Sequence, residues 1–213
     1  MENFKNIKIN TRCDVILRQG NVPTVEIAAD EGMKDWIDYE IRNGELILFT
    51  KPEHYGFLLM HDCYPKVNIT TKLLNSIEVL DRAFVSSKGV LETSKLGLTV
   101  KAGNVNLDIN TGRLDLTILK KANVKLNGVS VISNILIHDL GFYDGEDLDG
   151  SEGNICLNKD AKALISISEL FELRMYGRSR LELKGRPKIT LINMDDGCSI
   201  SNKMTESISN CNI

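Results

Sequence analysis

The acidic segment from Asp144 to Asn154, "DGEDLDGSEGN", concentrates the side chains best able to bind a cation. Carboxylate oxygens are the ligands that Ca²⁺ prefers. An EF-hand register with Gly150 at the sixth position places Gly145 first and Cys156 twelfth, and neither residue supplies the required carboxylate. The sequence therefore predicts a solvated turn between strands, not a metal site, for the carboxylates of this segment: Asp144, Glu146, Asp147, Asp149 and Glu152.

A second group of metal-capable side chains, His54, His61, Asp62 and Cys63, lies in one long segment with proline at both ends. A structural zinc site requires a second pair of ligands, which the sequence lacks, so no metal or cofactor is expected. The apolar side chains of the same segment would be costly to expose. We expect these side chains to cover an open end of the fold or to form a contact with a partner such as a second copy of the chain: Tyr55, Phe57, Leu58, Met60 and Tyr64. A small-ligand site is the alternative.

Catalytic motifs are missing from the chain. No Gly-x-Ser-x-Gly elbow occurs, and no glycine-rich phosphate loop. A fold that stacks its strands could bring Asp108 beside Asp115 or Glu182, as a glycoside hydrolase requires. Charged positions on exposed strands are the simpler interpretation, so we predict no catalytic residue. A carbohydrate-active β-helix enzyme is kept as an alternative.

Composition and charge exclude several classes of protein. The 213 residues, 42% hydrophobic and 26% charged, are typical of an ordinary globular protein. A net charge of -3, with scattered lysines and arginines, argues against nucleic-acid binding. No segment is long and apolar enough for a membrane helix. The five cysteines form no CxxC pair, which favours reduced thiols over zinc ligands or disulfides.

The N-terminal third reads as a mixed segment. Alternating apolar residues in "FKNIKI", "CDVILRQG" and "TVEIAAD" predict strands. Met33, Trp36 and Ile37 share one face at helical spacing, which predicts a short helix from about Asp30. The Asn43-Gly44 pair then predicts a turn before the strand "ELILF".

Beyond Val67 short strands recur, and one unit returns. "LTVKAGNVNL" from Leu98 resembles "LTILKKANVKL" from Leu116, and a period near twenty favours a solenoid of three short strands and three bends per coil. An antiparallel sandwich with hairpins such as Asn127-Gly128 is the competing architecture. In the solenoid, Lys120 to Asn123 form a solvated corner, Asn104 and Asn123 form a ladder, and five residues point inward: Leu114, Leu116, Ile118, Val124 and Leu126.

We therefore predict a mostly β, right-handed parallel β-helix-like solenoid in a single domain, 1–213. Residues 1–66 are expected to form an N-terminal β-rich capping segment with the short helix. Residues 67–201 would form the parallel solenoid, and residues 202–213 a C-terminal tail.

Several segments resemble the bacterial putative auto-transporter adhesin-like family, also called the head GIN domain. The resemblance is carried by "DVILRQGNVPTVEIAADEGMKDWIDYEIRNGELILF", by "KVNITTKLLNSIEVL" and "FYDGEDL", and by the closing "YGRSRLELKGRPKITLINMDDGCSIS". It covers residues from about Phe4 to Ser201. It implies a parallel solenoid behind an N-terminal β-rich segment, commonly exported, with no established enzymatic activity.

These observations together predict a non-enzymatic, adhesin-like structural or binding module with an unknown protein or glycan partner. An intracellular scaffold that forms homo-oligomers through the segment from His54 to Tyr64 is the other alternative. The given chain shows no signal peptide, which favours a cytoplasmic location. A leader removed beforehand would instead indicate the cell envelope or secretion.

Overall fold

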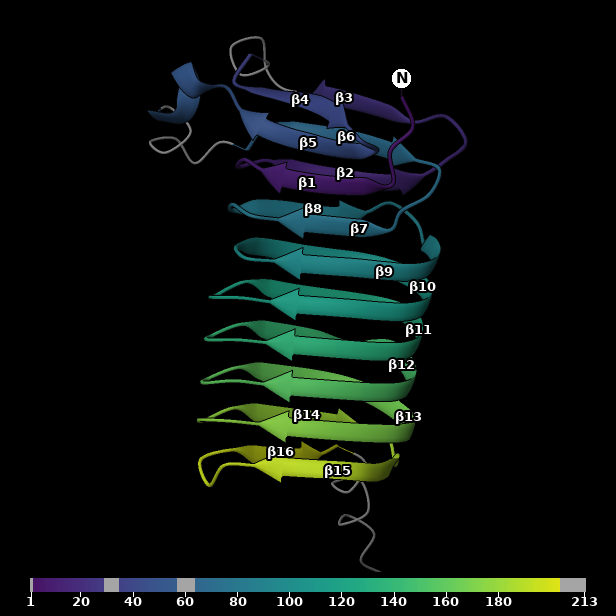
Figure 1. Ribbon diagram of the computed structural model, residues 1–213, viewed down its shortest axis with the longest axis vertical. Coiled ribbons are helices and arrows are strands. Elements are labelled where there is room, and N and C mark those ends of the chain that lie inside the picture. Colours follow the sequence, from purple (N-terminus) through teal and green to yellow (C-terminus); the bar gives the residue numbers. More distant parts are fainter. Residues whose placement is uncertain (1, 29–34, 57–63, 204–213) are drawn as a thin grey trace, which may run out of the picture.

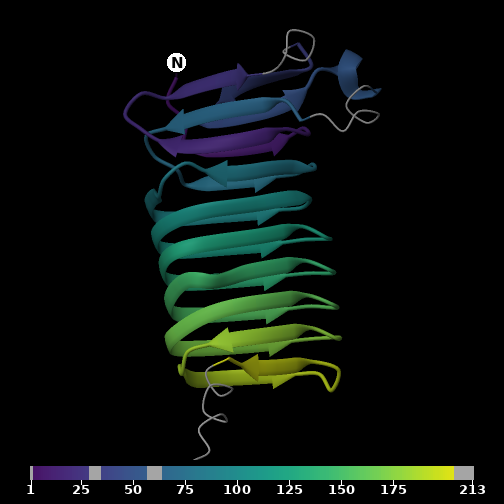
Figure 2. The same ribbon diagram turned by 180° about the vertical axis from the view of Figure 1, so that it is seen from behind.

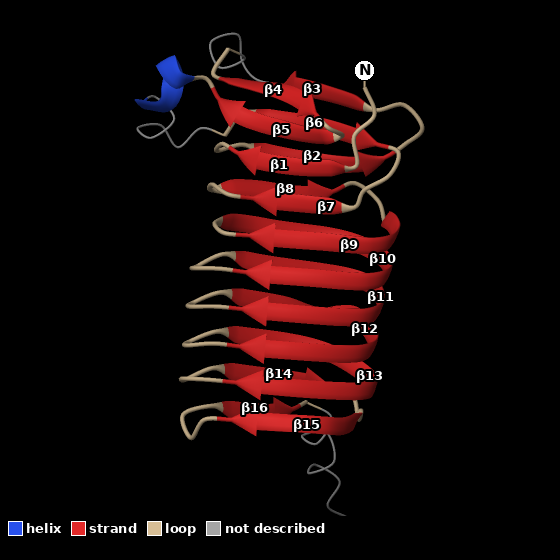
Figure 3. Ribbon diagram, viewed as in Figure 1, coloured by secondary structure: helices blue, strands red, loops and turns tan. Residues whose placement is uncertain are grey.

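The computed structural model describes residues 2–28, 35–56 and 64–203, and these form a parallel β-solenoid of about seven turns with 69% of residues in strands (Figures 1 and 3). As the chain descends in Figure 1, strands of the near sheet run from right to left, and strands of the far sheet run back. This sense of rotation is right-handed, as predicted. The strands are β1 (Asn6–Asn10), β2 (Asp14–Gln19), β3 (Thr24–Ala28), β4 (Ile37–Arg42), β5 (Glu45–Thr50), β6 (Lys66–Thr71), β7 (Ser76–Val79), β8 (Ala83–Ser87), β9 (Leu91–Val100), β10 (Gly103–Ile118), β11 (Asn123–Ile137), β12 (Phe142–Leu157), β13 (Lys162–Met175), β14 (Arg180–Lys184), β15 (Lys188–Met194) and β16 (Ser199–Asn202).

Two stacked sheets form the walls of the solenoid. The front sheet of Figure 1 contains β1, β5, β7, β15 and the second halves of the long strands, whereas the back sheet contains β2, β6, β8, β14, β16 and the first halves. Each long strand curves around one edge of the molecule, and tight corners close the other edge (Figure 2). Every central coil is thus one continuous strand of 14 to 16 residues, in place of the three short strands expected.

The repeat read from the sequence is the stacking register. β10 pairs with β11 in parallel from Asn104 opposite Asn123 to Ile118 opposite Ile137, an offset of 19 residues. Parallel pairing of successive coils excludes the antiparallel sandwich, because a hairpin at Asn127-Gly128 would pair its two arms with each other. The five predicted inward residues of these coils are all at most 1% exposed.

The corner at Lys120 is also confirmed. Lys120 has a φ of 56°, and the next corners place Asp139 at 61° and Lys159 at 63°. This left-handed conformation reverses the chain within four residues, and the buried Ala122 lets the next strand enter close to the core. Lys120 and Lys121 are exposed, as expected.

Two antiparallel strands cover the N-terminal end of the stack: β4 pairs with β5, and β3 pairs with β6. Part of the helix expected from Asp30 lies outside the described residues, but Ile37 begins β4, so the helical prediction is wrong from that position. Pairing with β5 decides the conformation, because it buries Ile37 to 1% exposure and leads into the Asn43-Gly44 turn, where both φ angles are positive. Among the described residues, helical conformation is confined to residues 52–56, which begin with the 3₁₀ turn Pro52–His54.

At the other end, the last described coil leaves four large aliphatic side chains 37% to 49% exposed, since no further described coil stacks on it: Ile189, Leu191, Ile192 and Ile200. Within the described residues, no helix is long and apolar enough to cross a membrane.

Cys13 is fully buried in the core, and burial, together with the nearby charges of Asp14 and Asp81, raises the pKa of its thiol. Because only the thiolate reacts quickly, we expect native protein treated with iodoacetamide at pH 8 to remain unmodified at Cys13. The half-buried Cys198 serves as the internal control. Peptide mass spectrometry measures both sites, and labelling of Cys13 at the rate of Cys198 without denaturant would contradict the packing.

Candidate functional site

A shallow groove of about 390 Å³ crosses the outer face of the back sheet, over β8, β10, β11 and β12. Its first row is built by register: Phe84 stacks on Asn104, Asn104 on Asn123, and Asn123 on Phe142. With neighbouring strands about 4.8 Å apart, the two phenylalanines are separated by roughly 14 Å. The side chain of Phe84 projects from the outer face of the sheet and is 44% exposed. Two aromatic side chains thus bracket a pair of amides.

The two amides form the predicted ladder. Asn123 Nδ2 donates a hydrogen bond to Asn104 Oδ1 over 2.9 Å. This bond uses one polar atom of each side chain, so the nitrogen of Asn104 and the oxygen of Asn123 retain capacity for a ligand. In the next row of the groove, Lys125 Nζ lies 3.2 Å from Asp144, and hydrogen bonding to that carboxylate raises the pKa of Lys125. Lys125 Nζ also lies 3.7 Å from Asp147, so two carboxylates neutralise this lysine on the far side of the groove.

A second, larger pocket of about 690 Å³ adjoins the groove at the corner edge and shares Phe84, Asn104 and Asn123 with it. We call it the corner pocket. It is lined by four basic residues and one acidic residue: Arg82, Lys101, Lys120, Lys121 and Asp81. Lys101 lies 3.6 Å from Glu78. Among the described residues, Arg82, Lys120 and Lys121 form no ion pair. The corner pocket thus carries an excess of positive charge.

The corner pocket includes one residue of the predicted contact segment. Tyr64 lies edge-on to Phe84, with ring centroids 5.0 Å apart and planes at 75°. Tyr55 is 50% exposed after the 3₁₀ turn. Phe57, Leu58 and Met60 lie outside the described residues. The expected contact role of these five residues stays a prediction.

Sequence reasoning missed Phe84 and Phe142, because each appears as one aromatic residue in an otherwise ordinary strand. Their relation to Asn104 and Asn123 exists only between coils. Aligning the sequences of four successive coils, and not only the two that resemble each other most, would have placed these four residues at the same position of the repeat.

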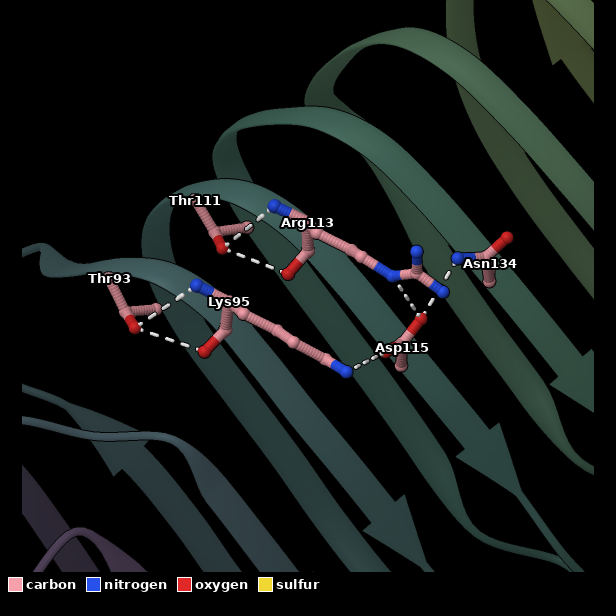
Figure 4. Close-up of polar contacts among 6 residues, drawn as sticks. All are labelled: Thr93, Lys95, Thr111, Arg113, Asp115 and Asn134. Carbon is pink, nitrogen blue, oxygen red and sulfur yellow. Dashed lines mark hydrogen bonds and ion pairs between the residues drawn. The ribbon is translucent and has the colours of Figure 1, made fainter.

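On the front sheet, Asp115 is the centre of a separate polar cluster, drawn in Figure 4. Lys95 Nζ lies 3.0 Å from its carboxylate, and Arg113 Nε and Asn134 Nδ2 each donate a hydrogen bond over 2.9 Å. Partial burial raises the pKa of Asp115, but the hydrogen bonds from Lys95, Asn134 and Arg113 outweigh that effect and hold the pKa below its usual value. A carboxylate so held is a poor proton donor.

Asp115→Asn is expected to lower the free energy of unfolding at pH 7 by no more than about 1 kcal/mol, because the ion pairs are partly solvated. A lowered folded-state pKa contributes stability above the unfolded value near 3.8, and this contribution is lost as pH falls through the folded-state pKa. Urea unfolding of both proteins between pH 7 and pH 2.5 should therefore show the difference shrinking as the pH falls. A difference that does not vary with pH would contradict this role.

The structure separates the carboxylates proposed as a catalytic pair. Asp108 lies in the back-sheet half of β10 and accepts a hydrogen bond from Asn127 over 2.9 Å, whereas Asp115 lies in the front-sheet half. Glu182, on β14, is four coils from Asp108, roughly 19 Å at the spacing of stacked strands. Carboxyl pairs of glycoside hydrolases lie closer than about 9.5 Å. Neither pair has the required arrangement.

The acidic segment does not form the solvated turn expected from its composition. It lies inside β12, where Leu148 and Ile155 are buried. The segment can be a strand because its side chains alternate: the inward positions hold glycine or apolar residues, and the carboxylates project outward. Glu146 lies 2.8 Å from Lys203, which also lies 3.7 Å from Glu182. Within the described residues, no group of three or more His, Cys, Asp or Glu side chains is arranged to hold a metal ion.

Comparisons with known proteins agree with this architecture. The family model described as "Putative auto-transporter adhesin, head GIN domain" matches residues 3–187. The chain is similar to the solved structure of a putative adhesin from Bacteroides fragilis NCTC 9343, with a TM-score of 0.86 and 18% identity over 94% of this chain and 93% of that chain. The chain is also similar to the structure of a putative adhesin from Parabacteroides merdae ATCC 43184, with a TM-score of 0.72 and 16% identity over 95% of this chain and 92% of that chain.

A structure named putative lipid binding protein, from Parabacteroides distasonis ATCC 8503, has a TM-score of 0.72 and 15% identity, over 95% of this chain and 93% of that chain. At these identities the likeness shows a shared fold. A search of curated proteins finds no significant match.

Proposed function

Because the chain belongs to the family of putative auto-transporter adhesins with the head GIN domain, we propose that it is a non-enzymatic binding module that attaches to its partner through the back sheet. The observation that carries this proposal is the groove on that sheet, where Phe84 and Phe142 bracket the Asn104–Asn123 ladder. Concave surfaces with exposed aromatic rings and a few fixed polar groups are the usual form of a binding site.

The rigidity of the platform supports a binding role. The groove residues stand on four strands held in register by continuous parallel pairing, and the side chains beneath them are buried, with Val105 and Val124 at most 2% exposed. A ligand therefore meets a surface that is already ordered, so little entropy is lost in arranging it.

A large side chain in the middle of the groove tests the proposal. Asn106 is exposed, lies between Ser86 and Lys125 in the second row, and takes no part in the ladder. We expect beads coated with the wild-type protein to be retained on a mucin-coated surface, which presents protein and glycan together. Beads coated with the Asn106→Trp variant should lose most of this retention.

Asn193→Trp is the matched control, since it adds the same side chain to an exposed position on the front sheet. Equal retention of the two variants, or wild-type retention no better than that of beads coated with albumin, would contradict the proposal.

Mass spectrometry of the supernatant tests whether the protein is non-enzymatic. Release of cleaved mucin glycans by the wild type would instead favour the carbohydrate-active alternative.

A further inference from the structure

The groove and the corner pocket are two parts of one surface, because Phe84, Asn104 and Asn123 line both. The groove part offers aromatic rings, amides and a lysine that is already paired with carboxylates. The corner part offers Arg82, Lys101, Lys120 and Lys121 against Asp81. A ligand that fills both must therefore combine a flat, weakly polar body with a negative charge at one end.

We infer that this composite site takes an acidic saccharide, with the sugar ring against Phe84 and the acidic group in the corner pocket. This inference rests on the function proposed above and specifies the class of ligand. A pyranose ring has one face of C–H groups, which an exposed aromatic ring can cover, and hydroxyl groups around its rim. The free amide nitrogen of Asn104 and the free amide oxygen of Asn123 match a hydroxyl acceptor and a hydroxyl donor.

Aromatic geometry supports the placement of the ring. Tyr64 meets Phe84 edge-on at 5.0 Å between centroids, so it fixes the orientation of the phenylalanine while leaving it 44% exposed. Phe142, three coils away, offers a second apolar surface at roughly 14 Å. An oligosaccharide that lies along the solenoid axis can contact both rings.

Charge explains why the saccharide should be acidic. Of the basic residues in the corner pocket, Lys101 is 3.6 Å from Glu78, while Arg82, Lys120 and Lys121 have no ion-pair partner among the described residues. The later corners differ, since Lys159 pairs with Asp139 and Arg178 with Asp160. The basic side chains at these two later corners are therefore neutralised, whereas those of Arg82, Lys120 and Lys121 beside the groove are not neutralised by any described residue. Charge-assisted hydrogen bonds from lysine and arginine favour carboxylate or sulfate groups.

Paired oligosaccharides provide the test. The probes are tetragalacturonate with its methyl ester, 3′-sialyllactose with lactose, and a heparin tetrasaccharide with its desulfated, N-acetylated form. We expect the wild-type protein to bind at least one carboxylated or sulfated member, measured by calorimetry, and to bind its less acidic counterpart about tenfold more weakly or worse. The two kinds of acidic group distinguish a carboxylate ligand from a sulfate ligand.

The double variant Lys120→Asn, Lys121→Gln should weaken that binding by about tenfold, because it removes two charges while asparagine tolerates the left-handed conformation at residue 120. The matched control, Lys72→Gln with Lys188→Gln, removes the same charge at exposed positions away from the corner pocket. Phe84→Ala should also weaken binding, without the change in salt dependence that the lysine variant shows.

Three results would overturn the inference: no acidic probe binds, each acidic probe binds no better than its counterpart, or the control variant loses as much affinity as the double variant. The proposed function fails separately, if Asn106→Trp leaves bead retention unchanged. If Asn106→Trp abolishes bead retention but the protein does not prefer acidic saccharides, the proposed function stands and only the inferred class of ligand is wrong.

Discussion

Gly128→Ala is expected to lower the free energy of unfolding by about 3 to 5 kcal/mol. Gly128 has a φ of 108°, which residues with a Cβ rarely adopt, and it lies between the back-sheet half and the front-sheet half of β11. An added Cβ would also lie 2.2 Å from the carbonyl oxygen of Ile109 in the preceding coil. That oxygen belongs to the backbone of a paired strand, so it cannot move without disturbing the stack.

Gly89→Ala separates the two contributions. Gly89 has a φ of 88°, but no atom lies within 4 Å of the position its Cβ would take. This variant is expected to lose only about 1 to 2 kcal/mol, the cost of the backbone conformation alone. Urea unfolding followed by circular dichroism measures both. Equal losses in the two variants would mean that the close approach to Ile109 has no energetic consequence.

Leu116→Ala is expected to cost about 2 to 5 kcal/mol, through lost burial and the cavity that remains. Leu116 is 1% exposed and stacks between Leu98 of β9 and Ile135 of β11. In a solenoid each coil contacts only its neighbours, so a cavity in a central coil weakens both interfaces and no distant element can compensate.

The control is Leu140→Ala, which removes the same atoms from a corner side chain that is 52% exposed. Its expected cost is within about 0.5 kcal/mol. Denaturant titrations of the two variants under identical conditions measure the contrast. A loss of less than about 1 kcal/mol for Leu116→Ala would contradict the stacked core described above.

Much of the architecture could be predicted from the sequence because it repeats. The offset of 19 residues between Asn104 and Asn123 is both a sequence period and the stacking register of β10 and β11. Alternation of apolar residues identified five inward side chains of β10 and β11. The corner at Lys120 was predicted because its sequence does not match a two-residue hairpin turn. These properties are local to one coil or to two adjacent coils, so the chain order itself displays them.

Predictions failed where pairing with a distant segment decided the conformation. Ile37 has helical spacing with Trp36 and Met33, but antiparallel pairing with β5 places it in a strand. The acidic segment has the composition of a turn, yet it is extended because its glycines and Leu148 fit the inward positions of β12. In both cases burial on a neighbouring coil outweighed the local preference.

The sequence by itself therefore determined the period, the parallel stacking, the inward residues predicted for β10 and β11, and the amide ladder. Only the tertiary structure decided the candidate site. Phe84, Asn104, Asn123 and Phe142 come from four coils and acquire a common face through register alone. The positive charge of the corner pocket likewise depends on which lysines find partners, and ion pairs such as Lys159 with Asp139 form between coils. These contacts depend on distances between residues of different coils, and residue types and their spacing along the chain do not specify such distances.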